Sequence, residues 1–252
     1  MKASDELWYD VSDGIATITI NRPDARNALN SGVREGIRSA LVDFGKDDAA
    51  KVLILTGSGD VAFCAGADLK EMANSHLAIP PDDFIPDLVT KKPVIAAING
   101  AALGGGFFLA QQADLVIAAE HATFGITEAR YGRGAPWAAP LPLLIPPRVA
   151  LELLLTARPI TAARAREAGL VNVVVPAEEL SSTTHRIAVQ IAGNAPLSVA
   201  AGKAMVQQIL VDVLGDAGEK AKRLWDDVYL SQDAQEGPEA FKDKRLPKWL
   251  GR

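Results

Sequence analysis

The 252-residue sequence has little of several residue types on which much protein chemistry depends. It holds one cysteine and three histidines, which excludes an internal disulfide bond and a cysteine-based zinc site. Lysine and arginine total 26 against 31 aspartates and glutamates, and the net charge of −5 argues against nucleic acid as a partner. The N-terminus lacks an apolar signal and the chain lacks an unbroken apolar run of about 18 residues, so we expect a cytoplasmic protein with no membrane partner. Catalysis would then depend on carboxylates and backbone dipoles.

Short apolar runs that alternate with helical patterns predict an α/β fold. Two segments flanking a Ser-Asp-Gly turn predict a hairpin, and four later runs predict buried parallel strands. The predicted strands are residues 7–11, 15–20, 52–56, 93–98, 115–119 and 171–175. Asn30 or Ser31 is expected to cap a helix that ends near Phe44, and Thr161 to start another. After Pro176 we predict only helices, at residues 178–192, 197–214, 217–230 and 237–244. We therefore divide the chain into a core, residues 1–195, and a helical region, residues 196–252.

The most informative segment is Gly104-Gly105-Gly106, which follows a predicted strand and opens a helix. Glycines let another atom approach the backbone, and a helix N-terminus presents unpaired N–H groups at its positive end. The segment lacks the Lys-Ser/Thr of a phosphate loop and the spacing of a dinucleotide fingerprint. Close helix packing and a functional role remain equally open for these glycines.

A second loop with a glycine, Ala65-Gly66-Ala67-Asp68, also follows a buried strand and precedes a helix. Asp68 is expected to cap that helix. Two such loops, each after a parallel strand, could direct two N–H groups at one oxygen. That arrangement would be an oxyanion hole.

Several segments in the same order resemble the crotonase superfamily, the enoyl-CoA hydratase/isomerase group. They are Asn21-Arg22-Pro23 with Asn27-Ala28-Leu29-Asn30, Ala65-Gly66-Ala67-Asp68, Lys92 to Gly100, Gly104-Gly105-Gly106, and Ala168-Gly169-Leu170-Val171. The resemblance implies a spiral of ββα units that binds acyl-CoA, followed by a helical trimerisation region. It also implies a homotrimer or a dimer of trimers, with coenzyme A entering as part of the thioester substrate and no other cofactor.

The resemblance also assigns roles to individual residues. The two N–H groups that hold the thioester oxygen match those of Ala67 and Gly105. Further positions match the substrate and CoA site: Ala65, Gly66, Asp68, Leu69, Gly104, Phe108, Trp137, Phe241 and Lys244. Of these, Trp137 would narrow the acyl pocket, and Lys244 fits a solvated surface charge unless a neighbouring subunit lies beside it.

Hydratases of this family use two glutamates, and only one of them is present here. The second position is Glu128, whereas the first is Phe108, whose ring cannot carry a proton. A double-bond shift needs one base that removes and returns a proton, so the sequence favours isomerisation by Glu128. Phe107, Phe108 and Trp137 are expected to desolvate Glu128 and raise its pKa. The dienoyl isomerases have an aspartate where this chain has Pro136, so their two-base mechanism is disfavoured.

Other functions remain open. One is a hydratase whose second acid comes from the segment that holds Asp82, Asp83 and Asp87. Another is a different enolate reaction: decarboxylation, C–C hydrolysis or dehalogenation. A third is a CoA-thioester binding protein that has lost catalysis.

The scarce nucleophiles and metal ligands are expected to have no catalytic role. The three histidines, His76, His121 and His185, lack the spacing of a zinc site or a triad. We expect Cys64 to be a small buried residue and Asp114 to have a structural role.

Overall fold

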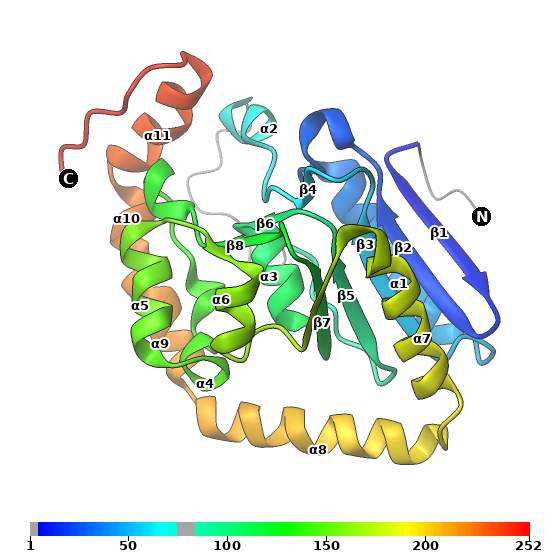
Figure 1. The fold of residues 1–252 in the computed structure, drawn as a ribbon. Coiled ribbons are helices and arrows are strands. Elements are labelled where there is room, and N and C mark those ends of the chain that lie inside the picture. Colours follow the sequence, from blue (N-terminus) through cyan, green and yellow to red (C-terminus); the bar gives the residue numbers. More distant parts are fainter. Residues whose placement is uncertain (1–4, 75–83) are drawn as a thin grey trace.

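A central sheet of six strands has the order β1-β2-β3-β5-β7-β10 in the computed structural model, which describes residues 5–74 and 84–252 (Figure 1). The strands are β1 (Leu7–Ser12), β2 (Ile15–Ile20), β3 (Val52–Gly57), β5 (Val94–Ile98), β7 (Leu115–Ala119) and β10 (Val173–Val175). β1 and β2 form the predicted antiparallel hairpin, and every later pair of neighbours is parallel. The hairpin and the four parallel strands are therefore confirmed, with ends that differ by at most two residues.

Both faces of this sheet are covered, which explains why the parallel strands β3, β5, β7 and β10 are largely apolar runs. On β5, Ile95 joins a hydrophobic cluster with α7 (Leu180–Ala192), whereas Ala96 joins the larger cluster with α1 (Ser31–Lys46). Of the two predicted candidates for the cap of α1, Asn30 and Ser31, the structure has Asn30: its side chain accepts a hydrogen bond of 2.9 Å from the backbone N–H three residues later.

A second, smaller sheet was not predicted. Its strands are β4 (Ala62–Cys64), β6 (Ala101–Leu103), β8 (Thr123–Gly125) and β9 (Ile160–Thr161), in the order β4-β6-β8-β9. Strands of two or three residues are too short to show a period, so the sequence pattern could not reveal them. Three of them follow a long strand: β4 follows β3, β6 follows β5 and β8 follows β7, whereas β9 follows α5. The helices α2 (Leu69–Asn74) and α3 (Gly105–Gln112) come directly after β4 and β6, which gives the ββα spiral that the resemblance implies.

Shorter helical segments connect the remaining strands. They are α4 (Leu141–Leu144), α5 (Pro147–Thr156), α6 (Ala162–Glu167) and the 3-10 turns η1 (Pro23–Ala25), η2 (Glu128–Tyr131), η3 (Pro136–Ala138) and η4 (Ala177–Glu179). Thr161 caps α6 as predicted, because its hydroxyl accepts a hydrogen bond of 3.2 Å from the Arg164 N–H.

The chain ends in α8 (Pro196–Leu214), α9 (Ala217–Leu224), α10 (Asp226–Leu230) and α11 (Asp233–Lys242). One helix predicted over residues 217–230 is two, since Trp225 ends α9 and precedes α10. The prediction that the last helix starts at Gly237 was also wrong, because Gly237 and Pro238 lie inside α11. Without a Cβ, Gly237 lies directly against the Tyr131 carbonyl group, which holds α11 on η2.

Helix α8 lies across one end of the molecule, apart from α9 to α11 (Figure 1). None of its residues is buried. Its exposed apolar residues are Leu197, Met205, Val206, Ile209, Val211 and Val213. Among the described helices α8 alone is long and apolar enough to span a membrane by length and composition, which for a single helix is weak evidence. On the side facing the core, Lys203 forms an ion pair of 2.7 Å with Asp114.

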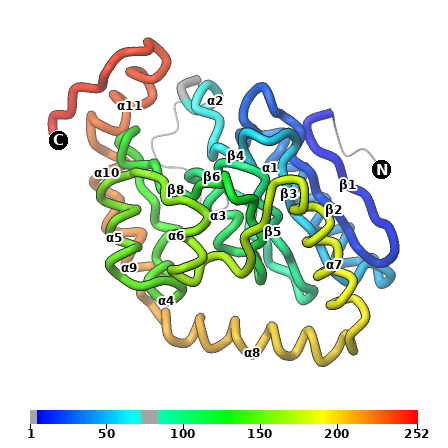
Figure 2. Tube along the Cα trace, viewed as in Figure 1, coloured from blue at the N-terminus to red at the C-terminus, as the bar shows by residue number. Residues whose placement is uncertain are grey.

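Figure 2 shows the chain path, with the N-terminal hairpin and the C-terminal segment at opposite sides of the molecule. Helix α11 nevertheless contacts both α2 and η2 from the catalytic core predicted by the sequence. The boundary drawn after residue 195 immediately precedes α8, but the segments after α8 return to the core.

Candidate active site

The two glycine-containing loops meet at the carboxyl ends of β4 and β6. Leu29 and Ala67 form a parallel bridge, in which the Leu29 N–H donates to the Gly66 carbonyl group at 2.8 Å and the Asp68 N–H donates to the Leu29 carbonyl group at 3.2 Å. In a parallel bridge these bonds belong to the residues on either side of Ala67, so its own N–H points the other way. A Cβ on Gly66 would lie 3.2 Å from the Gly105 nitrogen, which shows how closely the two loops approach.

The N–H groups of Ala67 and Gly105 remain available at this meeting point. Within the described residues, neither group donates a hydrogen bond to a protein acceptor. Gly105 is also the first residue of α3, where the helix dipole is positive. The geometry therefore fits the oxyanion hole predicted from the two loops.

The three consecutive glycines have three different surroundings. Gly104 has a φ of +54°, and a Cβ there would lie 3.1 Å from Glu128 Oε1. A Cβ on Gly105 would meet the Ile85 side chain, and one on Gly106 would collide with the Cys64 carbonyl group. The sequence left a packing role and a functional role equally open for these glycines. In the structure Gly106 allows close packing against Cys64, whereas Gly104 lies in the site against Glu128.

Glu128 begins η2, three residues after β8, and its carboxyl group lies over Gly104. Within the described residues, its Oε2 atom is buried and has no hydrogen-bond partner. Burial raises the pKa of Glu128 to about 7, while hydrogen bonds from backbone groups of Glu128 and Thr127 and from the Trp137 side chain partly oppose the shift. A carboxyl group with this pKa is divided between its acid and base forms near neutral pH.

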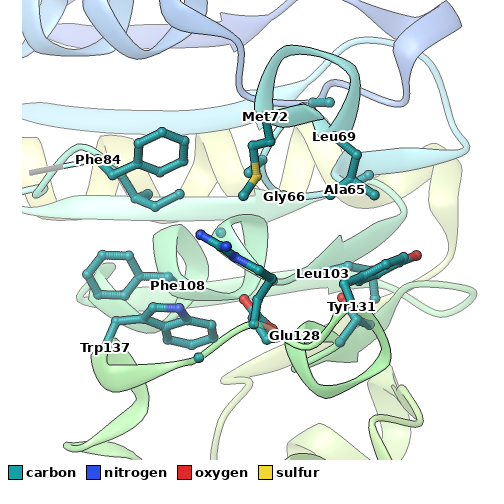
Figure 3. A pocket seen from close by; sticks show the side chains of 18 of the residues that line it. Ala65, Gly66, Leu69, Met72, Phe84, Leu103, Phe108, Glu128, Tyr131 and Trp137 are labelled. Atoms are coloured by element: carbon teal, nitrogen blue, oxygen red, sulfur yellow. The ribbon is translucent and has the colours of Figure 1, made fainter. Parts of the chain in front are cut away.

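An aromatic cluster forms the wall beside Glu128 (Figure 3). The ring centroids of Phe108 and Trp137 are 5.4 Å apart, and those of Phe107 and Trp137 are 5.9 Å apart. Phe107 is fully buried, whereas Phe108 and Trp137 line the cavity. These rings contribute to the burial that raises the pKa of Glu128, in the direction predicted.

The residues surround a cavity of about 1250 Å³. Figure 3 shows its two walls, with Gly66, Leu69 and Met72 on one side and Glu128 and Trp137 on the other. All the predicted site residues but one line it: Ala65, Gly66, Ala67, Asp68, Leu69, Gly104, Gly105, Phe108, Glu128, Trp137 and Phe241. Lys244 is the exception, since it is exposed beyond α11 with a φ of +53° and does not line the cavity.

Asp68 has the predicted capping role as well as a place in the cavity wall. Its Oδ1 accepts hydrogen bonds from the Lys70 and Glu71 N–H groups, and its Oδ2 forms an ion pair of 3.0 Å with Arg22. Burial tends to raise the pKa of Asp68, but the hydrogen bonds from Arg22 and the Glu71 N–H lower it overall. Asp68 is thus an ionised carboxylate that fixes the loop.

Among the cavity residues that sequence reasoning did not assign to the site are Arg133 and Tyr229. Arg133 is only 7% exposed, and its guanidinium carbon lies 5.0 Å from the centroid of the Tyr229 ring. The Tyr229 hydroxyl group donates a hydrogen bond of 3.1 Å to the Gly134 carbonyl group. Burial raises the pKa of Tyr229 to about 12. No local pattern marks these residues, because α10 brings Tyr229 to a loop 95 residues earlier in the chain.

Glycines join this loop to the C-terminal helices at further points. A Cβ on Gly132 would collide with the Asp233 carbonyl group, and a Cβ on Gly134 would lie 3.0 Å from the Tyr229 ring and hydroxyl group. With the Gly237–Tyr131 contact, three close approaches connect the Glu128 wall to α10 and α11. The C-terminal helices of the same chain therefore form part of the site.

The residues that were expected to have no catalytic role have surroundings that fit this expectation. Cys64 is fully buried, and burial raises its pKa to about 12. Asp114 accepts hydrogen bonds from the Val94 N–H and from Lys203. His121 and His185 are exposed, and no group of three metal-ligating side chains occurs among the described residues.

The acidic segment proposed as a source of a second acid is only partly described. Asp82, Asp83 and His76 lie outside the described residues. Asp87 lines the cavity, so this segment does bring a carboxyl group to the cavity wall.

Comparison with known proteins agrees with this geometry. The model of the enoyl-CoA hydratase/isomerase family matches residues 10–252. The chain is 38% identical to a probable mitochondrial enoyl-CoA hydratase of Dictyostelium discoideum, over 93% of this chain and 87% of that protein. It is 36% identical to a carnitinyl-CoA dehydratase of Salmonella typhi, over 99% and 100%. The crystal structure of a carnitinyl-CoA hydratase from Mycobacterium avium superposes with a TM-score of 0.89 at 38% identity, covering 99% of this chain and 100% of that one.

Proposed function

Because the chain belongs to the enoyl-CoA hydratase/isomerase family of the crotonase superfamily, we propose that it moves a proton on an acyl-CoA thioester through an enolate. The observation that carries the proposal is the Glu128 carboxyl group. It is buried over Gly104 with a pKa of about 7, and the next residue, Gly105, has an N–H that donates to no acceptor among the described residues. A base of this strength, next to an oxyanion hole, suits abstraction of a proton next to a thioester carbonyl group.

In the proposed reaction, the thioester oxygen accepts hydrogen bonds from the Ala67 and Gly105 N–H groups. Glu128 removes a proton from C2 of a 3-enoyl-CoA, and the electron pair of that C–H bond moves into the enolate. The C3–C4 double bond then shifts to C2–C3 as Glu128 returns the proton to C4. Loss of one oxyanion donor would slow such a step by about 10²–10³-fold. The reaction requires no coenzyme beyond the CoA of the substrate.

Hydration or dehydration is the second candidate, because the relatives with the highest similarity reported above are named hydratases and dehydratases. This reaction needs both a base for water and an acid for C2. Phe108 supplies neither group, so Asp87 or another carboxyl group would have to assist Glu128. The aromatic ring at position 108 therefore favours the isomerase over the hydratase.

A comparison of two substrates tests the choice. Wild-type protein should convert 3-hexenoyl-CoA to 2-hexenoyl-CoA faster than it hydrates crotonyl-CoA, and should exchange C2 protons in D₂O. Glu128→Gln should lose at least about 10³-fold in both isomerisation and exchange, while Glu120→Gln, an exposed matched control at the end of β7, should not.

The other outcomes are equally definite. Faster hydration of crotonyl-CoA would favour the second candidate. Absence of exchange in the wild type with bound acyl-CoA would indicate a binding protein without catalysis. Unchanged turnover in Glu128→Gln would remove Glu128 from the mechanism.

We also propose that the protein forms a trimer, or a dimer of trimers, through α8. The exposed apolar residues of that helix support the proposal, because association of subunits would remove their apolar surface from water.

A further inference from the structure

Three aromatic side chains, those of Phe84, Phe108 and Trp137, line one part of the cavity, which we call its aromatic end. The ring centroids of Phe108 and Trp137 are 5.4 Å apart, and the planes of these two rings differ by 32°. Phe84 lies on the opposite wall (Figure 3). All three residues are half-buried, so the protein itself does not cover their rings completely.

Phe84 is held in place by a cation. The guanidinium carbon of Arg34 lies 4.3 Å from the centroid of the Phe84 ring. Arg34 is itself fixed, by an ion pair of 2.9 Å with Glu71 and by a hydrogen bond of 2.9 Å to the Leu29 carbonyl group. Among the described residues that line the cavity, Phe84 is present and Arg34 is not, so the cation stabilises the ring from outside the cavity. The aromatic end therefore has a preformed surface on each wall.

The aromatic end adjoins the predicted oxyanion hole. Phe108 follows Gly105 by three residues, so about one turn of α3 separates them. In Figure 3, Ala65 and Leu69, from the loop that the resemblance assigns to the CoA channel, lie on the far side of Glu128 from the aromatic end. A thioester whose carbonyl group is held at Gly105, with its CoA along that loop, would direct its acyl chain into the aromatic end.

The chemistry of the aromatic end favours a flat ring over an alkyl chain. The cavity residues next to the three rings in sequence are apolar: Ile85, Pro136, Ala139 and Pro140. Burial of apolar surface there would stabilise any hydrocarbon group. Two aromatic rings in an offset or edge-to-face contact gain more than their buried area provides, because the negative face of one ring meets the positive edge of the other. A saturated ring of the same carbon number has no such charge distribution.

We propose that the aromatic end makes this cavity selective for acyl-CoA thioesters whose acyl chain ends in an aromatic ring, bound between Phe84 and the pair of Phe108 and Trp137. The proposal rests on the acyl-CoA function proposed above and names the substrate class of the same site. It gives Phe108 a role in recognition, in addition to the absence of a carboxylate at this position.

Equilibrium binding tests the proposal without depending on turnover. Titration calorimetry would compare two pairs of equal carbon number: 3-phenylpropanoyl-CoA with 3-cyclohexylpropanoyl-CoA, and 5-phenylpentanoyl-CoA with 5-cyclohexylpentanoyl-CoA. The cyclohexyl member is the larger and more apolar, so burial of apolar surface alone would favour it. For at least one pair, wild-type protein should instead bind the phenyl member about 3- to 10-fold more tightly.

Leucine variants locate the effect. Phe84→Leu and Phe108→Leu each remove one ring but keep an apolar side chain, so each should reduce the preference for the phenyl member, and the double variant should abolish it. Phe241→Leu is the matched control. Phe241 lines the same cavity from α11, where its ring packs edge-on against Tyr131, and its loss should leave the preference unchanged.

Thermal unfolding of each variant would confirm that it is folded. Equal or tighter binding of the cyclohexyl member in both pairs by the wild type would overturn the proposal. So would a preference that survives in the double variant, or one that Phe241→Leu abolishes, which would place the aromatic group elsewhere in the cavity. If the phenyl members bind as expected and the wild type exchanges no C2 proton, the proposed function fails while the selectivity of the aromatic end stands.

Discussion

The carboxyl group of Glu128 lies over Gly104 so closely that a methyl group on this glycine would be 3.1 Å from Oε1. The two residues come from different turns of the spiral, Gly104 after β6 and Glu128 after β8. Because β6 and β8 are parallel neighbours, their carboxyl ends lie side by side, and residues that follow them meet. The position of the predicted base thus follows from the pairing of two three-residue strands.

Alanine substitutions should separate the roles of the glycines. Gly104→Ala places a methyl group against the Glu128 carboxyl group at a positive φ, so we expect at least a 10²-fold loss of kcat with about 1–3 kcal/mol of destabilisation. Gly106→Ala forces a methyl group into the Cys64 carbonyl group, and we expect little folded protein. Gly45→Ala, with open space around it in α1, is the control and should stabilise the helix. Circular dichroism melts and initial rates would measure both effects.

The rate should depend on the ionisation of Glu128. The base form predominates only above its pKa of about 7, so kcat/KM should rise with pH and level off above that value. Below pH 7 the rate should fall about tenfold per pH unit. A profile with its midpoint near pH 4.5, the ordinary value for glutamate, would contradict the effect of burial.

The free energy of unfolding should depend on pH in the opposite direction to the rate. Burial raises the pKa of Glu128 from 4.5 to about 7, so the folded state binds a proton that the unfolded state has lost between these values. The wild type should therefore lose about 3 kcal/mol of unfolding free energy as pH rises through this window, since each pKa unit corresponds to about 1.4 kcal/mol. Glu128→Gln has no such charge, so its stability relative to wild type should increase from pH 4.5 to pH 8. Urea titrations at both pH values would measure the difference in unfolding free energy between Glu128→Gln and the wild type. If that difference is the same at pH 4.5 and pH 8, Glu128 is not a buried ionisable group.

Charge on α8 should prevent assembly. Val206, Ile209 and Val213 lie at helical spacing, and each is more than half exposed. Replacing Ile209 by lysine should convert trimers to monomers in sedimentation velocity, while Gln207→Lys, on an already exposed polar position, should not. Monomeric wild-type protein at micromolar concentration would contradict the assembly proposed here.

Features that depend on residues close together in the sequence could be predicted more readily than features that depend on contacts between distant segments. The hairpin and the cap of α1, predicted at Asn30 or Ser31, depend on neighbours within a few residues, and the strand β5 is marked by its own apolar run. The motifs that resemble the family located Ala67, Gly105 and Glu128, which the structure brings to one cavity. Their catalytic roles stay predictions.

What escaped prediction depends on contacts between distant segments. The short strands β4, β6 and β8 exist because the preceding long strands place them beside one another. The stacking of Arg133 on Tyr229 depends on the return of α10 to the core. The last helix was predicted to start at Gly237, whereas α11 starts at Asp233, and the contact between Gly237 and Tyr131 holds this helix on η2.

The glycine contacts that join residues 131–134 to α10 and α11 also limit how this site can diverge. Gly132 and Gly237 each face a backbone carbonyl group across the boundary, so neither side tolerates an added side chain without a matching shift on the other. The loop that carries Arg133 and the C-terminal helices are therefore coupled by these contacts and have to change together. A chimera that exchanges the loop alone between two relatives should fold poorly, whereas one that exchanges the loop together with residues 226–242 should keep its specificity.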